Sequence, residues 1–170
     1  MKKLLIIIFL LLFSLNLSGE NISLTKNFIK FDVKKPLKIS SKYLEITEIK
    51  KNIYQFHYKN NVVTVQEDSK VYSDELIAIY DKINKKLLKV NFIGNIKIKS
   101  KTTICSCNSA LFLPDKDKIY LKGNIKILQD KNLFNGEEMI IDLKNNTTIL
   151  KGKSKRINTI FNTGGNVKNR

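Results

Sequence analysis

The sequence predicts an all-β fold in which repeated units of antiparallel strands stack on one another and leave both ends of the stack open. Apolar residues alternate with lysine in Ile96-Lys97-Ile98-Lys99 and again in Ile125-Lys126-Ile127, which is the two-residue period of a sheet with one buried and one solvated face. Gly-Asn precedes both segments, and Gly94 and Gly123 are 29 residues apart. A β-repeat of this length indicates units that bury their apolar faces only against their neighbours.

Each unit of the repeat contains one element of constant design. An eight-residue element begins ten residues after each of Asn61, Asn95 and Asn124. Its residue types follow the order apolar, any, small, polar, any, apolar, any, apolar. The three elements are residues 71–78, 105–112 and 134–141, and residues 39–46 form a weaker forerunner. An alternating strand then closes each unit at a glycine, which is Gly94, Gly123 or Gly152. We therefore expect the same strand arrangement in each unit.

Turn and bend residues punctuate the expected strands. We expect the Gly-Asn pairs to make tight turns between strands, because both residues tolerate a positive φ. Residues 81–86, 114–117 and 144–146 carry further turn signals. The small residue of each repeated element suits a bend or bulge at which a strand turns a corner; these residues are Ser73, Cys107 and Gly136.

The N-terminus has the features of a targeting signal. Met1-Lys2-Lys3 precedes an apolar run from Leu4 to Leu17, and polar residues follow, so residues 1–19 are expected to be a secretory signal peptide. The run is shorter than the roughly 20 residues that a membrane-spanning helix needs, and an uncleaved anchor is the alternative. Beyond it we expect a flexible segment at 20–34, one domain at 35–162 and a disordered tail at 163–170.

The chain is strongly basic. It has 31 lysine and arginine residues against 15 aspartate and glutamate residues, a net charge of +16, and only Arg156 and Arg170 are arginine. Without residues 1–19, which hold two lysines, the balance is 29 against 15, or +14. Lysine supplies a diffuse positive field rather than planar, bidentate recognition. An enrichment in Asn, Ile and Lys accounts for part of this charge, and an exported basic protein also meets phosphate-bearing lipid.

No catalytic, metal or cofactor site is expected. Cys105 and Cys107 are two residues apart in a predicted strand, so they share a face, and a local bridge between them would be strained. A metal site needs more ligands than these, and His57 is remote in sequence. We expect buried thiols, with redox or intermolecular pairing as the alternative, and we expect His57 at the surface or at a sheet edge.

The chain resembles the LptA/OstA-like family from Lys35 onward. "KPLKISSKYLEI" from Lys35 is similar to the family's opening motif, and "NVVTVQEDSKVYSDEL" from Asn61 is similar to its Asn-Val-x-Val-x-Gln…Asp-x-Leu pattern. "LKGNIKILQDKNLFNGEEMIIDLKNN" and "KRINTIF" continue the likeness in order, so that it covers about residues 35–162. The chain departs from the family pattern with Asn60 in place of glycine and Lys42 in place of aspartate.

This resemblance implies a periplasmic, twisted, open-ended β-jellyroll that carries lipopolysaccharide or a related glycolipid from the inner to the outer membrane. The implied partners are the lipopolysaccharide or lipid A-like glycolipid, inner-membrane anchored and outer-membrane components of the transport bridge, and further copies of the chain joined head to tail. Two alternatives stay open. One is a membrane-anchored, LptC-like component that retains residues 4–17. The other is a secreted basic polyanion binder, although nucleic acid is disfavoured because arginine is not interleaved with exposed aromatic residues.

The repeat phase predicts which residues face a common apolar groove for acyl chains, although an ordinary sealed core is the alternative for any single one. The expected lining is Leu37, Ile39, Leu44, Ile46, Val62, Val71, Leu76, Ile96, Ile98, Leu121, Ile125, Ile127, Phe134 and Met139. The motif at Pro36 should open the stack. Residues 155–161 should close it, and the edge expected to pair with a neighbouring chain is Arg156, Ile157, Asn158, Thr159, Ile160 and Phe161.

Overall fold

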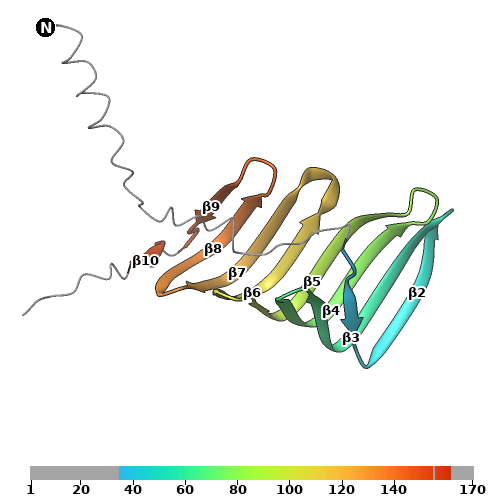
Figure 1. Cartoon of the computed structure of the whole chain (residues 1–170), viewed down its shortest axis with the longest axis horizontal. Helices are drawn as coiled ribbons and strands as arrows, with labels where there is room; N and C mark the ends of the chain where they lie inside the picture. Colours follow the sequence, from blue (N-terminus) through green and yellow to red (C-terminus); the bar gives the residue numbers. More distant parts are fainter. Residues whose placement is uncertain (1–34, 155, 162–170) are drawn as a thin grey trace, which may run out of the picture.

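The computed structural model describes residues 35–154 and 156–161 (Figure 1). The predicted signal peptide at 1–19, the segment 20–34 and the tail 163–170 lie outside the described residues. Within the described part the fold is all-β, as predicted, with one short 3-10 turn, η1 (Pro114–Lys116). The strands are β1 (Lys38–Ser40), β2 (Tyr43–Lys50), β3 (Ile53–Gln66), β4 (Ser69–Asp81), β5 (Lys86–Lys99), β6 (Thr103–Leu113), β7 (Lys118–Gln129), β8 (Asn132–Asp142), β9 (Thr147–Lys151) and β10 (Asn158–Ile160).

The strands follow one another as an antiparallel meander from β3 to β8. Both ends of this meander are split. β1 and β2 pair with different halves of β3, and β9 and β10 pair with different halves of β8. Figure 1 shows the long central strands curving between these two split ends. The sheet is not closed into a barrel, so it has an open edge at β1 and β2 and another at β9 and β10.

The Gly-Asn pairs lie inside strands, and the prediction that they form turns between strands is wrong. Gly94-Asn95 lies within β5 and Gly123-Asn124 within β7, and Asn60-Asn61 takes the same place in β3. All three pairs have a positive φ at both residues. Each pair stands opposite a single residue of the next strand, as Asn60-Asn61 does opposite Asp74. The pairs are therefore β-bulges, which add local twist and bend the strand.

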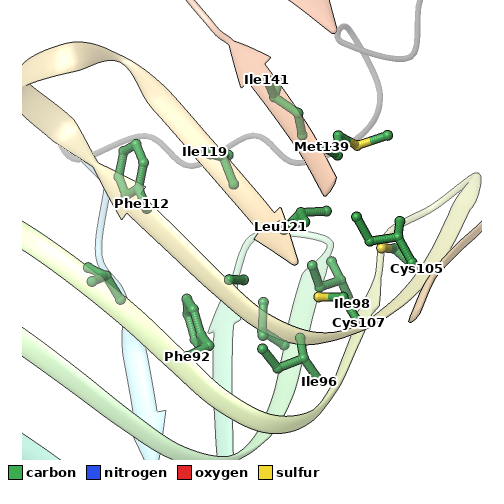
Figure 2. Packing of buried hydrophobic residues seen from close by; sticks show 14 of the residues in the cluster. Phe92, Ile96, Ile98, Cys105, Cys107, Phe112, Ile119, Leu121, Met139 and Ile141 are labelled. Carbon is green, nitrogen blue, oxygen red and sulfur yellow. The ribbon is translucent and has the colours of Figure 1, made fainter. Parts of the chain in front are cut away.

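The bulges form a corner that runs across the sheet and divides it into two walls. The small residues of the repeat lie beside this corner, as predicted. We call one half wall A, made of residues 43–59, 75–93, 109–122 and 138–151. The other half is wall B, made of residues 38–40, 62–73, 96–107, 125–136 and 158–160. Buried side chains of the two walls form one hydrophobic cluster (Figure 2).

The repeat of the sequence corresponds to rows of side chains that cross the strands. In wall B, cross-strand partners place Val71, Ile98, Cys105, Ile127 and Phe134 in one row. Cross-strand partners point to the same face of a sheet, so one repeat of 29 residues moves a side chain two strands along its row. Because every unit supplies the same apolar face, neighbouring units complete one another's core, as the sequence predicts.

Candidate functional site

The interior between the walls is the candidate functional site, and most of the predicted lining residues meet there. Ten of them belong to the buried cluster. These are Val62, Val71, Leu76, Ile96, Ile98, Leu121, Ile125, Ile127, Phe134 and Met139. Ile39 packs against the cluster, and Leu37 is half-buried. Leu44 and Ile46 are exposed instead of buried, because they lie on β2, which forms the open edge of wall A.

Sequence reasoning missed seven of the ten buried residues of wall A. Phe92, Phe112, Ile119 and Ile141 point into the same interior as the predicted residues (Figure 2). Val90, Ala78 and Ala110 complete this set. The signal was present in the repeat, because a step of 29 residues leads from Val90 to Ile119 and from Phe112 to Ile141. Applying the same 29-residue step to the strand halves beyond the corner identifies these residues.

The middle of the interior is closed and its β2 end is open. Leu76 and Leu121 have no solvent exposure, so side chains fill the space between the walls there. Leu44 and Ile46 continue a wall A row, because their cross-strand partners Tyr58 and Phe56 pack against the cluster. Their side chains are nevertheless 44% and 55% exposed. An apolar ligand can therefore reach the interior face from this end without unfolding the sheet.

Cys105 and Cys107 are free, buried thiols of wall B, as the sequence predicted. Figure 2 shows both beside Ile98 in the interior. A hydrogen bond with Cys107 and burial raise the pKa of the Cys105 thiol far above its usual range. A thiol held in its neutral form is a poor nucleophile and a poor metal ligand. Cys105 therefore serves as a small apolar side chain of the lining, and Cys107 is buried in the same wall.

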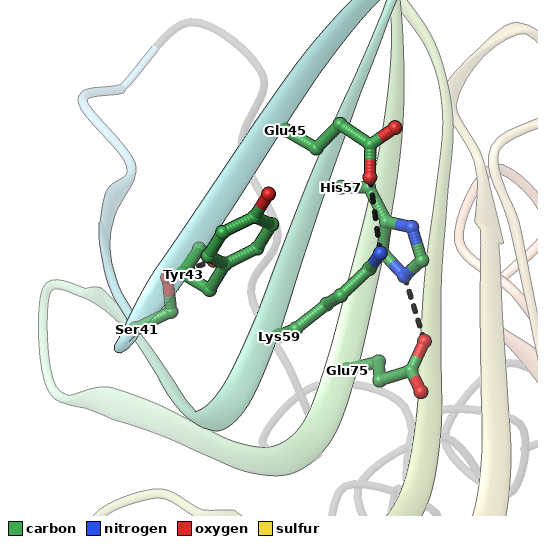
Figure 3. Close-up of polar contacts among 6 residues, drawn as sticks. All are labelled: Ser41, Tyr43, Glu45, His57, Lys59 and Glu75. Carbon is green, nitrogen blue, oxygen red and sulfur yellow. Dashed lines mark hydrogen bonds and ion pairs between the residues drawn. The ribbon is translucent and has the colours of Figure 1, made fainter.

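The outer face of wall A near β2 carries a ladder of charged side chains (Figure 3). His57 Nε2 lies 2.6 Å from Glu75 Oε2, and Lys59 Nζ lies 3.0 Å from Glu45 Oε2. Lys59 also stands 5.6 Å from the centre of the Tyr43 ring. The hydrogen bond from Lys59 lowers the pKa of Glu45 and raises that of Lys59. His57 thus lies on an outer sheet face, one strand in from the edge.

The C-terminal end of the stack is held by short contacts. β10 is shorter than the predicted closing strand, because Arg156, Ile157 and Phe161 flank it outside the strand. The Phe161 ring packs edge-on against Phe134, with ring centres 5.7 Å apart. Glu137 accepts hydrogen bonds from the backbone amides of Lys153 and Ser154 at 2.9 and 3.0 Å. These contacts hold Lys153 and Ser154 at Glu137 and place Phe161 beside β8.

Two properties of the described residues bear on other kinds of site. These residues contain no group of three or more His, Cys, Asp or Glu side chains that could hold a metal ion. None of the helical segments within residues 35–154 and 156–161 has the length and apolar character to cross a membrane.

Comparisons with known proteins identify the fold and the family. A comparison with curated protein sequences returned no significant match. The structure is similar to the crystal structure of LptH, the LptA homologous periplasmic component of the lipopolysaccharide transport device of Pseudomonas aeruginosa. The TM-score is 0.62 at 17% identity, over 76% of this chain and 96% of LptH. Residues 38–147 match the family described as LptA/(LptD N-terminal domain) LPS transport protein. The chain therefore belongs to the LptA/LptD N-terminal family of lipopolysaccharide transport proteins.

Proposed function

We propose that this protein is a periplasmic carrier that binds lipopolysaccharide or a related glycolipid by its acyl chains and passes it from the inner to the outer membrane. The observation that carries the proposal is the apolar interior that remains accessible at the β2 end, in a chain of a lipopolysaccharide transport family. The proposed role is transport and involves no chemical step by the protein. The export signal expected at residues 1–19 agrees with a periplasmic location.

Burial of acyl chains would supply the main favourable free energy. Removing apolar surface from water contributes about 25 cal/mol per Å², so even partial burial of several chains outweighs any single polar contact. Leu44 and Ile46 offer the first apolar surface, and the rows behind them lead into the cluster. Chains that enter deeper must part the two walls, because side chains fill the middle. The walls can part at their hairpin loops, since hydrogen-bonded strands join them only through the corner.

Lysine side chains would add a weaker, long-range attraction for phosphorylated headgroups. Lys97 and Lys126 point outward, between buried neighbours on the same strands, and Lys99 follows the buried Ile98 at the end of β5. Exposed charges act as a diffuse field that salt screens. We therefore expect salt to weaken glycolipid binding only modestly.

A binding experiment on the mature protein tests the proposal. Lipid A is titrated against the parent, against Leu44→Asp/Ile46→Asp and against the matched outer-face variant Tyr43→Asp/Thr47→Asp on the same strand. Two charges on the interior face should weaken binding roughly tenfold or more, because each charge would have to be desolvated beside an acyl chain. The outer-face variant should bind as the parent does. Absence of binding by the parent, or equal loss in both variants, would contradict the proposal.

Two measurements separate the alternatives. Raising salt from about 50 to about 500 mM should change lipid A affinity only slightly, whereas a fall of several decades would identify a polyanion binder. Sequencing the mature N-terminus separates the soluble carrier from a membrane-anchored, LptC-like component. A start near residue 20 supports the carrier, and a retained run from Leu4 to Leu17 supports the anchored component.

A further inference from the structure

The two walls differ in the chemistry of their inward faces. Six polar residues are buried in the described part of the chain, and all six belong to wall B. They are Thr64, Gln66, Ser73, Thr103, Gln129 and Asn132. The buried residues of wall A are all apolar, and Leu87 and Leu143 extend its apolar face toward the hairpin loops. Among the described residues the interior therefore has one largely apolar wall, in which the half-buried Thr148 carries a buried hydroxyl, and one amphipathic wall.

Four of these residues, Gln66, Thr103, Gln129 and Asn132, lie at the lip of wall B, which we define as the inward positions next to its hairpin loops. Thr64 lies one row deeper and Ser73 lies beside the corner. Gln66 pairs across strands with Ser69, and Thr103, Gln129 and Asn132 are successive cross-strand partners. The backbone amide of Ser100 donates to the Thr103 carbonyl at 2.8 Å within the hairpin between β5 and β6. A polar row thus runs along the lip in place of the apolar rows found deeper in the wall.

The repeat preserves this polar row in every unit. Five residues after the asparagines that start the units, the chain has Gln66, Ser100 and Gln129. Eight residues after them it has Ser69, Thr103 and Asn132. All six positions are polar, although the row beside them is almost entirely apolar. The lip is therefore a property of the repeated unit and not of one hairpin.

Three hydroxyl groups in this wall, those of Thr64, Ser73 and Thr103, are buried without a hydrogen-bond partner within the described residues. Ser73 lies beside the corner, whereas Thr64 and Thr103 lie next to or at the lip. Thr64 and Thr103 are 1% and 2% exposed, and the Oγ1 atom of each has no hydrogen-bond partner within the described residues. A buried polar atom that makes no hydrogen bond destabilises a fold, whereas valine would fill the same space at no such cost. Both hydroxyls point into the interior. They have the capacity to bond a polar group brought in by a ligand.

A cavity of about 490 Å³ lies beside the same lip. Its walls include Ser69, Ser100 and Lys101 from two neighbouring hairpins, together with Lys35. The Gln66 side-chain amide donates to the Lys35 carbonyl at 3.2 Å, which ties the segment before β1 to the lip. The cavity has no apolar side chain in its lining. It suits a hydrated, polar group that continues from the lip toward solvent.

We propose that the wall B lip binds the polar junction of the glycolipid, where ester and amide carbonyls and hydroxyls join the acyl chains to the headgroup. This inference rests on the proposed function and adds an orientation to it. The acyl chains lie against wall A, and the Thr64 and Thr103 hydroxyls donate hydrogen bonds to junction carbonyls. The headgroup then points past the wall B lip, into and beyond the cavity. Every unit holds the lipid the same way round, so the lipid need not turn over as it moves along the stack.

The test removes single hydroxyls on opposite walls of the full chain. Thr64→Val/Thr103→Val deletes the two wall B hydroxyls next to and at the lip, and Thr148→Val is the matched control. Thr148 pairs with Ile141 on wall A, and its Oγ1 is likewise buried without a partner. The binding of two ligands is compared. One is lipid A, and the other is diphenylhexatriene, a hydrocarbon without hydrogen-bonding groups. Thermal unfolding of each variant verifies that the fold is retained.

We expect the wall B variant to bind lipid A roughly fivefold to tenfold more weakly for each hydrogen bond lost, and to take up diphenylhexatriene as the parent does. Thr148→Val should leave both affinities unchanged. Equal lipid A affinity in the wall B variant and the parent would overturn the orientation, and so would an equal loss in Thr148→Val. These results differ from a failure of the proposed function, in which the parent itself would not bind lipid A.

Discussion

At the scale of single residues, the corner depends on two glycines that no other residue replaces freely. Gly94 and Gly123 have φ values of +74° and +77°. A Cβ on Gly94 would lie 2.2 Å from Asp74 Oδ2, and one on Gly123 would lie 2.6 Å from Asn108 Nδ2. Asp74 also accepts a hydrogen bond from the Asn95 side chain at 2.9 Å. The polar residue of each repeated element thus packs under the next bulge and holds the bend in place.

Gly123→Ala should therefore destabilise the protein. The substitution combines left-handed backbone strain with a steric overlap, and we expect a loss of about 1–3 kcal/mol in the free energy of unfolding. Asn60→Gly is the control, since Asn60 already carries a Cβ in the same left-handed conformation. Its effect should stay within about 0.5 kcal/mol. Denaturant unfolding measures both, and an equal effect of the two substitutions would show that the corner places no special demand on Gly123.

At the scale of elements, two hairpins of wall A use the same aspartate cap. Asp81 Oδ1 accepts the Asn84 backbone amide at 3.0 Å, and Asp142 Oδ1 accepts that of Asn145 at 2.9 Å. Both asparagine side chains donate to the second carboxylate oxygen. These hydrogen bonds lower the pKa of both carboxyl groups, and the bond from the backbone amide has the largest effect. The caps are therefore strongest when the aspartates are ionised.

The cap predicts acid sensitivity with a definite sign. A carboxyl group whose pKa is lower in the folded state stabilises the fold above its ordinary pKa of about 4, and this contribution disappears as pH falls through the folded pKa. Asp81→Asn/Asp142→Asn should lower the melting temperature at pH 7 and flatten its decline below about pH 4. Asp68→Asn, in a different hairpin, is the control. If the melting temperature of the double variant fell as steeply below about pH 4 as that of the parent, the result would contradict this role of the aspartates.

The sequence allowed the strands, the repeat and the hairpins at 81–86 and 144–146 to be predicted, because each depends on local alternation and turn chemistry. The role of Gly-Asn could not be predicted locally. Two consecutive residues with positive φ can close a hairpin or form a bulge, and pairing decides between them. Here β5 continues past Gly94 and keeps pairing with β4, so that Ile98 lies opposite Val71. The same misread turn concealed part of the wall A lining. On β5 and β7 the buried residues keep one alternation through the two-residue bulge, so Val90, Phe92 and Ile119 are in phase with the predicted residues beyond it.

The polar lip was also absent from the sequence-based site, although the repeat contains it. Polar residues next to a turn are usually solvated, so Thr103 and Gln129 look like ordinary loop-flanking residues in the sequence. Their burial depends on the facing wall, which only the three-dimensional arrangement supplies. The exposure of Leu44 and Ile46 has a similar origin, because the sequence does not show which strand lies at the edge.

At the scale of the whole molecule, the open edges make assembly the natural consequence of the fold. β2 and β9 each have one hydrogen-bonded neighbour within the described residues, and so do β1 and β10. Unpaired strand edges can add a strand from another chain. The two ends differ, so such contacts are head-to-tail and continue into filaments. Joined in this way, the interiors of successive copies would be continuous.

Deleting residues 155–170 should therefore abolish concentration-dependent assembly, because the deletion removes β10 and the Phe161 contact with Phe134. The remaining domain should still fold and bind lipid A, since none of residues 156–161, the described part of the deletion, belongs to the buried cluster. Analytical ultracentrifugation over a range of concentrations measures the first effect. Undiminished assembly of the shortened chain would show that another surface builds the bridge.

The central claim is that acyl chains lie between the two walls, and site-specific photo-crosslinking to lipid A tests it most directly. A benzophenone amino acid replaces one aromatic residue at a time, at Phe92 and Phe112 in the interior or at Tyr72 and Tyr120, which alternate with buried residues and face outward. The account predicts crosslinked lipid at both phenylalanine positions and little or none at the tyrosines. Crosslinks confined to Tyr72 and Tyr120, or of equal yield at all four positions, would contradict it.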